Sequence, residues 1–428
     1  MHHRVTGNDA IWLQDTATNP MVINAIITTD RLDLQTLRDT FRVRVLEAEE
    51  GRRYARFRHR VVWHGSSPRW EEDPDFDISR HIFAAADRDI HTTEELQRFA
   101  GAEASRPLPE DRPRWQFHFV EEFETGGSAV VVRIHHSIAD GIALMAVIFA
   151  FMEEMTAEHL AVPRGAIRPA AGAPGRGMLQ MIAVPLAAPG ILIRRLLWTP
   201  DRHALHGPAV SGRKLVAWTA PLDLEVVKAA KNRLDATVND VLMACVSGAI
   251  SRYLARHANQ TIHRVRVSMP VNVRRPSERL AMENKFAAVP LELPAGIPDL
   301  ATRVTQVKLR MDELKRSAAP IVVYGIQRAL LAALPQAVSR WLIDFLANKC
   351  TAVVTNVPGP QRDLTLAGRR VRNMMFWVPQ RANIGLGISV LSFAGKVQVG
   401  VIVDAGLIPD ARDLTRAFEE EFEALRAL

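Results

Sequence analysis

Two adjacent histidines, His135 and His136, stand in the stretch RIHHSIADG, and Asp140 follows the second of them by four residues. Imidazole is the side chain that most often acts as a general base, because its ordinary pKa lies close to working pH. A carboxylate close by can cap a helix or form an ion pair that fixes the turn. The spacing therefore predicts proton transfer by one histidine, with Asp140 in a supporting role.

The strand predicted before the pair separates the two histidines. Residues 129–134 read AVVVRI, an apolar strand whose side chains alternate between two faces. Ile134 shares a face with His136, whereas Arg133 shares a face with His135. Burial against an apolar wall keeps an imidazole neutral, because desolvation disfavours the imidazolium. His136 is therefore the predicted base, and His135 is a supporting residue.

Asp140 and Gly141 stand at the start of the next predicted helix. An aspartate in this position can accept hydrogen bonds from the free backbone N–H groups of the first turn. It can also form an ion pair that holds the turn, and His136 with it, in place. The two roles are compatible, and the pattern alone does not choose between them.

Hydrophobic periodicity predicts an α/β protein with a sheet in each half of the chain. The predicted helices span residues 33–50, 141–155, 223–233, 239–256, 300–316 and 410–428. The predicted strands span residues 22–28, 114–123, 129–134, 265–270, 286–293, 351–355, 384–393 and 397–404. In each half a β-hairpin leads into a helix, and the hairpin of the first half carries the histidine pair.

A stretch rich in proline, glycine and alanine, residues 161–177, is typical of a linker. It divides the chain into an N-terminal half (1–160), a crossover (161–205) and a C-terminal half (206–428).

The crossover contains an apolar run, residues 178–198, which prolines interrupt and which carries Arg194 and Arg195 near its end. Its length and its prolines make a membrane span improbable. We expect it to pack between the halves, or to lie in a membrane interface with its arginines toward the headgroups.

The chain has 428 residues and a formal net charge of +7. A basic surface suits an anionic membrane, a nucleotide-bearing cofactor or nucleic acid. The basic residues are scattered, without the aromatic-interleaved basic runs of a nucleic-acid binder, so we expect no nucleic-acid partner.

The two cysteines, Cys245 and Cys350, stand in apolar runs, which favours buried core thiols and a cytoplasmic location. The N-terminus lacks the apolar core of a secretory signal. The histidines show no metal-ligand spacing with thiols or carboxylates, so we expect neither a metal nor a bound cofactor.

Four motifs together resemble a known family. HHSIADG matches the His-His-x-x-x-Asp-Gly signature of the chloramphenicol-acetyltransferase-like superfamily. Three further stretches are similar to motifs of the bacterial wax ester synthase/diacylglycerol acyltransferase family: HGPAVSGRK (206–214), TVNDVLMACVSGAISRYL (237–254) and TNVPGP (355–360). Their order fits nearly the whole chain. The resemblance implies two chloramphenicol-acetyltransferase-like halves with mixed sheets and an active-site tunnel between them.

The same resemblance implies roles for particular residues. The second histidine, His136, would be the base. Asn239 and Asp240 would line or support the site, with the Asn239 amide as an oxyanion donor. Because this pair opens a predicted helix, helix capping is the alternative reading. Arg274, which follows a predicted strand, would be the ion-pair partner of Asp140.

The function implied is O-acyl transfer from a fatty acyl-CoA to a diacylglycerol or a long-chain alcohol, without a covalent enzyme intermediate. The enzyme would be cytoplasmic and peripherally associated with a membrane or lipid-droplet surface. Two alternatives stay open: a condensation-type enzyme that uses carrier-bound donors, and a non-catalytic lipid-binding protein of the same fold.

Overall fold

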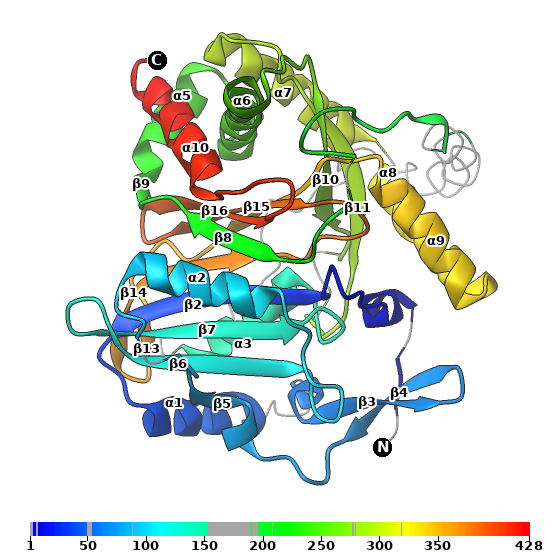
Figure 1. Cartoon of the computed structure of the whole chain (residues 1–428), viewed down its shortest axis with the longest axis vertical. Helices are drawn as coiled ribbons and strands as arrows, with labels where there is room; N and C mark the ends of the chain where they lie inside the picture. Colours follow the sequence, from blue (N-terminus) through cyan, green and yellow to red (C-terminus); the bar gives the residue numbers. More distant parts are fainter. Residues whose placement is uncertain are drawn as a thin grey trace.

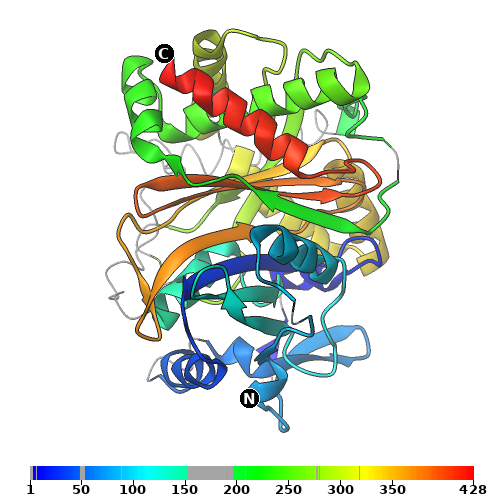
Figure 2. The same ribbon diagram turned by 60° about the vertical axis from the view of Figure 1, so that its left-hand side comes forward.

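The computed structural model describes residues 3–5, 7–48, 54–87, 89–152, 190, 196–207, 209–275, 278, 280–317 and 319–428. The predicted linker and most of the apolar crossover, Arg194 and Arg195 included, lie outside this part of the chain. The described elements form two stacked sheets with helices on their outer faces, and Figures 1 and 2 show this layering from two sides.

The first sheet is built mainly from the N-terminal half. Its six strands follow the order β13-β14-β2-β7-β6-β5, and all neighbours are antiparallel except β5 and β6. The strands are β2 (Val22–Asp30), β5 (Ile82–Ala84), β6 (Trp115–Phe123), β7 (Gly127–His135), β13 (Thr365–Leu366) and β14 (Arg369–Trp377). All nine residues of β7 are buried, because this strand runs through the middle of the sheet.

The second sheet has seven strands in the order β11-β10-β12-β15-β16-β8, with β9 also paired to β16. It is mixed, because β12 runs parallel to both β10 and β15 while the other pairs are antiparallel. The strands are β8 (Lys214–Trp218), β9 (Leu222–Asp223), β10 (Val265–Asn272), β11 (Phe286–Leu293), β12 (Ala352–Pro358), β15 (Leu386–Phe393) and β16 (Lys396–Asp404). These mixed sheets confirm the predicted α/β class.

A strand from the C-terminal half completes the N-terminal sheet. β14 pairs with β2 along most of its length, with Met375 opposite Ile26. The sheets therefore do not follow the predicted division at residue 206 strictly. The apolar pattern of a strand shows that it pairs but not with which sheet, so this exchange could not be predicted.

Helices cover both outer faces, and the outer face of the second sheet carries α5 (Leu224–Arg233), α6 (Val238–Ala258), α7 (Leu300–Arg316) and α10 (Arg412–Arg426) (Figure 1). The helices α1 (Leu34–Phe41) and α3 (Gly141–Phe151) bury apolar side chains in the core of the first sheet. Between the sheets, α2 (Thr93–Ala104) packs so closely on β8 that a Cβ at Gly101 would lie 3.0 Å from the Lys214 carbonyl oxygen.

The remaining elements lie at the sides of the two layers. The helices α8 (Ala319–Ala333) and α9 (Gln336–Ala347) lie at one side of the body, where α8 packs on β11 and η1 (Gly7–Leu13) (Figure 1). A small sheet joins β1 (His3–Arg4), β3 (His59–His64) and β4 (Ser67–Glu72), and further short helical turns are η2 (Arg42–Leu46), η4 (Ala55–Phe57) and η5 (Ile78–Arg80). No helix in the described ranges combines the length and the apolar character needed to cross a bilayer.

Candidate active site

The histidine pair lies where the central strand β7 ends. His135 is its last residue, and His136 begins the following turn, where its backbone N–H donates to the Met21 carbonyl 2.8 Å away. The two rings contact different parts of the protein, as the alternation of the strand predicts.

His135 is held on both ring nitrogens. Its Nε2 lies 2.9 Å from Asp15 Oδ2, and its Nδ1 lies 2.7 Å from Ser137 Oγ. Burial lowers the pKa of His135, although Asp15 opposes the shift. In the neutral ring, Nε2–H donates to Asp15 and Nδ1 accepts from Ser137. Both nitrogens are then occupied, which suits a structural residue better than a base.

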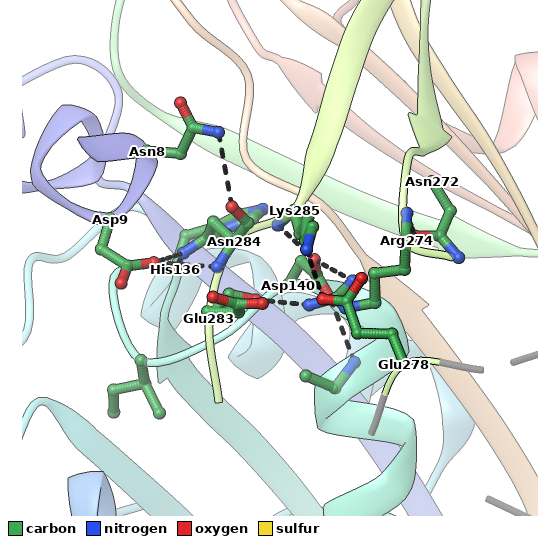
Figure 3. A network of polar contacts seen from close by, with 12 residues as sticks. Asn8, Asp9, His136, Asp140, Asn272, Arg274, Glu278, Glu283, Asn284 and Lys285 are labelled. Carbon is green, nitrogen blue, oxygen red and sulfur yellow. Dashed lines mark hydrogen bonds and ion pairs between the residues drawn. The ribbon is translucent and has the colours of Figure 1, made fainter. Parts of the chain in front are cut away.

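His136 is held on one nitrogen only. Its Nδ1 lies 2.8 Å from Asn284 Oδ1 (Figure 3). The Asn284 amide nitrogen donates to Asp9 Oδ1 at 2.9 Å and to the His136 carbonyl at 2.8 Å. Both of these partners can only accept, so the amide orientation is fixed by its surroundings.

This arrangement sets the tautomer of His136. Because Asn284 presents an acceptor oxygen, Nδ1 of His136 must carry the proton. The lone pair is then on Nε2, which has no hydrogen-bond partner among the described residues. A neutral imidazole with a free Nε2 lone pair is the form that accepts a proton in general base catalysis.

The surroundings of His136 keep the ring neutral. Burial lowers the pKa of His136 to about 4, and the bond to Asn284 and the charge of Asp140 only partly offset this effect. Trp12 stacks on the ring with 3.7 Å between centroids and an interplanar angle of 10°, and Phe286 lies at 5.7 Å. These aromatic rings exclude water from two sides.

A cavity of about 190 Å³ begins at His136 and takes its wall from both halves of the chain. Ile11 and Trp12 of η1 join it from the N-terminal half. The rest of the wall is largely apolar and comes from Trp198, β10, β11, α8, α9, residues 349–350, β12 and residues 378–384. The described lining has few polar side chains: Ser268, Gln327, Lys349, Arg381 and His136 itself. Such a wall suits a long alkyl chain.

Asp140 fills both roles considered for it. Its Oδ1 accepts from the Ala143 N–H at 3.0 Å and so caps α3. Its Oδ2 lies 2.6 Å from Arg274 Nη1, in an ion pair whose side chains are 5% and 0% exposed. The pairing of Asp140 with Arg274 expected from the resemblance is therefore present.

This ion pair also positions Asn284. Asp140 Oδ2 accepts from the Lys285 backbone N–H at 2.9 Å, and Arg274 Nη2 donates to the Glu283 carbonyl at 2.7 Å. The two neighbours of Asn284 are thus tied to the pair (Figure 3). Because Asn284 holds the ring of His136, Asp140 and Arg274 act on the histidine through it.

Asp9 ties the opposite side of the site. Its Oδ1 accepts from both the backbone N–H and the amide of Asn284, and its Oδ2 pairs with Arg56 at 2.8 Å. Arg56 in turn donates to the carbonyls of Ser137 and Ile138 at 3.1 and 2.9 Å. The turn that carries His136 is therefore fixed by buried charges on two sides.

Asp9, Trp12 and Asn284 are site residues that the sequence analysis missed. Asp9 and Trp12 are three residues apart on η1, so they lie on one face of that 3-10 turn. This spacing was the only local signal for them. Nothing in the sequence shows that a short N-terminal turn meets residue 284.

Asn239 is not brought into the cavity of His136. It is the second residue of α6, it does not line that cavity, and its Oδ1 accepts from Asn356 Nδ2 at 2.9 Å. Asp240 forms a capping box with Thr237, in which Asp240 Oδ2 accepts from the Thr237 N–H at 2.9 Å. The proposed oxyanion role of Asn239 stays a prediction, while the capping role of Asp240 is observed.

Gly141 is the first residue of α3, and a Cβ added there would meet no atom within 4 Å. Packing therefore does not require glycine at this position. Cys245 and Cys350 are both buried and neither forms a disulfide, as predicted for core residues.

Substitution of Asn284 by leucine tests its control of the tautomer. Leucine has a similar volume but no acceptor for Nδ1–H, so both neutral tautomers of His136 become accessible. We expect kcat/KM to fall at least about tenfold, because the lone pair no longer stays on Nε2. The ¹⁵N shifts of His136 report the tautomer directly. A variant that keeps a protonated Nδ1 and full activity would exclude this role.

Comparisons with known proteins agree with these observations. Residues 6–176 match the model of the wax ester synthase/diacylglycerol acyltransferase catalytic domain, and residues 282–426 match that of the WS/DGAT C-terminal domain. A probable diacylglycerol O-acyltransferase, tgs1 of Mycobacterium tuberculosis strain H37Rv, is 25% identical over 383 residues. That alignment covers 85% of this chain and 82% of the relative.

Solved structures share the fold at low sequence identity. A wax ester synthase/diacylglycerol acyltransferase from Marinobacter aquaeolei VT8 superimposes with a TM-score of 0.72 at 19% identity, over 99% of both chains. The first condensation domain of the calcium-dependent antibiotic synthetase gives a TM-score of 0.60 at 18% identity, over 100% of this chain and 96% of the domain.

Proposed function

This chain belongs to the wax ester synthase/diacylglycerol acyltransferase family, and on that basis we propose that His136 is the general base of an O-acyl transfer from fatty acyl-CoA. The acceptor is the hydroxyl of a diacylglycerol, giving a triacylglycerol, or of a long-chain alcohol, giving a wax ester. The observation that carries the proposal is a buried, neutral His136 that lines an apolar cavity and whose Nε2 has no hydrogen-bond partner among the described residues.

The reaction needs one proton carrier. Nε2 of His136 takes the hydroxyl proton as the oxygen attacks the thioester carbonyl, which forms a tetrahedral intermediate. The intermediate then expels the CoA thiolate, which receives the proton from the imidazolium. The C–O bond of the ester forms and the C–S bond of the thioester breaks, without a covalent enzyme intermediate.

The imidazolium that forms in this reaction has supporting groups. Asn284 Oδ1 accepts a hydrogen bond from Nδ1–H of His136 throughout, and the stacked face of Trp12 offers a cation–π contact. The developing oxyanion adds a negative charge beside the ring, so the imidazolium is less unfavourable during reaction than in the empty site. The resemblance assigns the oxyanion donor to Asn239.

Parallel assays with two acceptors test the function. Labelled acyl-CoA is offered with hexadecanol and with diacylglycerol, and the lipid products are separated. We expect ester formation with at least one acceptor. Turnover only with acyl chains on a carrier protein would favour the condensation-type alternative. Condensation domains share the fold of this chain. Absence of turnover with every donor would favour a lipid-binding protein.

The low pKa of His136 predicts an unusual pH profile. The base form is active, and its pKa is lowered by burial to about 4, so kcat/KM stays flat as pH falls through the ordinary histidine range. Below about pH 5 it falls with protonation of the ring. The free energy of unfolding also falls as pH falls, because the unfolded chain takes up a proton on this ring near pH 6.5 and the folded chain only near pH 4. The contribution of the neutral His136 ring to the free energy of unfolding is therefore complete above about pH 6.5 and is lost as pH falls toward 4.

The measurement is kcat/KM with a soluble acyl-CoA, paired with denaturant unfolding at each pH. An acid limb centred near the ordinary histidine pKa would show that water reaches His136 freely. It would contradict the buried state described above.

We also propose that the enzyme works at a membrane or lipid-droplet surface, because the acceptors named here are insoluble in water. The cytoplasmic location belongs to the same proposal. The interfacial role expected for Arg194 and Arg195 concerns residues outside the described part of the chain.

A further inference from the structure

The helix pair α8–α9 is apolar on its inner side. Val323, Ile326 and Leu330 of α8 and Ile343 and Leu346 of α9 line the cavity that begins at His136. The pair is therefore one wall of the site, and substrate that occupies the cavity lies directly beneath these helices.

The outer side of the pair is apolar as well. Trp341 is 64% exposed, Ile321 46% and Val338 45%. The other exposed positions of the pair carry small or uncharged residues. Among the described side chains between residues 319 and 347, Arg328 is the one that is both charged and exposed. Large apolar side chains exposed on a helix surface with so few charges are typical of a contact with another protein surface or with lipid.

The apolar surface continues beyond the helices. Leu196 and Leu197 are 36% and 76% exposed, and they precede Trp198, which lines the cavity. Lys349 links this segment to α9, because its Nζ donates to the Trp198 carbonyl at 2.6 Å and lies 4.1 Å from the Phe345 ring.

Trp341 stacks on the Phe345 ring with 5.7 Å between the ring centroids, so Phe345 connects Trp341 with Lys349. We call the exposed side chains of Leu197, Ile321, Val338 and Trp341 the hairpin patch. Five of the eight large apolar side chains that are exposed in the described ranges, Leu196 included, lie on these two helices or on the segment linked to them, which is a concentration beyond single scattered apolar residues.

The charges around the patch favour an anionic surface as its partner. Arg328 and Arg340 are the cations of the pair, and Asp344 is its single carboxylate, shared between Arg340 at 3.8 Å and Arg381 at 2.7 Å. The whole chain carries a net charge of +7. An apolar patch with basic neighbours and an exposed tryptophan is the composition of an interfacial membrane contact.

We propose that the hairpin patch docks on an anionic phospholipid bilayer, and that lipid substrate passes from the bilayer into the cavity beneath α8 and α9. The passage of lipid substrate into the cavity rests on the proposed acyl transfer, whereas the docking does not. Of the four residues of the hairpin patch, Leu197 belongs to the apolar run 178–198 considered in the sequence analysis, whereas Ile321, Val338 and Trp341 lie on α8 and α9.

Flotation with vesicles of phosphatidylcholine and phosphatidylglycerol tests the docking. The variant Val338→Glu/Trp341→Glu places two charges in the patch without touching a residue of the catalytic network. We expect its bound fraction to fall at least about tenfold relative to the wild type, because charge opposes insertion of the patch. Trp63→Glu is the matched control, since Trp63 is also exposed (42%) but lies on β3. It should bind like the wild type.

Two activity assays separate docking from catalysis. With a short-chain acyl-CoA and a water-soluble alcohol, the double variant should match the wild type, because its site is intact. With diacylglycerol embedded in the same vesicles it should lose at least about tenfold in rate. Failure of the acyl-transfer proposal would appear as no turnover in any assay while flotation still distinguishes the variants.

The remaining outcomes overturn the docking. One is equal flotation of the wild type and the double variant, or no flotation of either. Another is a double variant that changes oligomeric state by light scattering, which would assign the patch to a second copy of the chain. A third is a double variant that loses its fold by circular dichroism without lipid, while Trp341→Ser also lowers thermal stability. The patch would then be covered by the chain itself.

Discussion

Replacement of His136 by alanine is expected to lower kcat/KM by about a hundred- to ten-thousand-fold while the fold is retained. The loss is that of a general base, and its size follows from the usual contribution of such a group. The fold should persist, because the ring makes one side-chain hydrogen bond and its removal leaves Asn284 still held by Asp9. The measurements are acyl transfer to a soluble alcohol and circular dichroism.

His135→Ala is the matched control for this experiment. It removes a ring that is 1% exposed and takes one hydrogen bond each from Ser137 and from Asp15, which keeps Arg114 and the Met21 N–H as partners, so stability should fall by about 1–3 kcal/mol. Catalysis should fall much less than in the His136 variant, because both nitrogens of His135 are occupied. An inactive His135 variant beside an active His136 variant would reverse the assignment of the base.

The local structure of the site could be predicted because it follows from short-range periodicity. The alternation of β7 assigned the two histidines to different sides, and their contacts show this separation. The helices predicted at 223–233 and 300–316 and the strand at 286–293 correspond to α5, α7 and β11. In each of these elements one face is apolar over its whole length, which is the signal that periodicity detects.

The helix pair α8–α9 was not predicted. Its residues line a cavity on one side and are exposed on the other, yet both sides are largely apolar. In α9, Gln336, Arg340 and Asp344 recur every four residues, so a polar stripe with helical period is present there and the sequence analysis missed it. In α8, Gln327 and Arg328 are the strongly polar residues, which leaves less contrast between its faces.

The network around His136 could be predicted only in part. The pairing of Asp140 with Arg274 was expected from the family resemblance, and these residues are separated by 134 positions. Asn284 and Asp9 are 275 positions apart, and neither stands in a recognised motif. The contact between them arises from how the two sheets pack, which local patterns do not specify.

Loss of the buried ion pair is expected to give the largest change in stability. Arg274→Met leaves Asp140 as an uncompensated charge in a site that is 5% exposed, which should lower the free energy of unfolding by about 3–5 kcal/mol. Asp140→Asn retains a cap for α3 and should cost a comparable amount, because it leaves the guanidinium of Arg274 unpaired. Asp140→Ala should cost about 1 kcal/mol more through loss of the cap. Urea denaturation measures each of these values.

Catalysis should fall together with stability in these variants. The pair holds the backbone of Glu283 and Lys285, and through them Asn284, so its loss frees the ring of His136. The matched control is Arg31→Met, which breaks an ion pair with Glu122 whose side chains are 64% and 65% exposed. An exposed pair contributes at most about 1 kcal/mol, and this one lies away from the site. If Asp140→Asn were as stable and active as the wild type, the ion pair would carry neither role, and only the helix cap of Asp140 would stand.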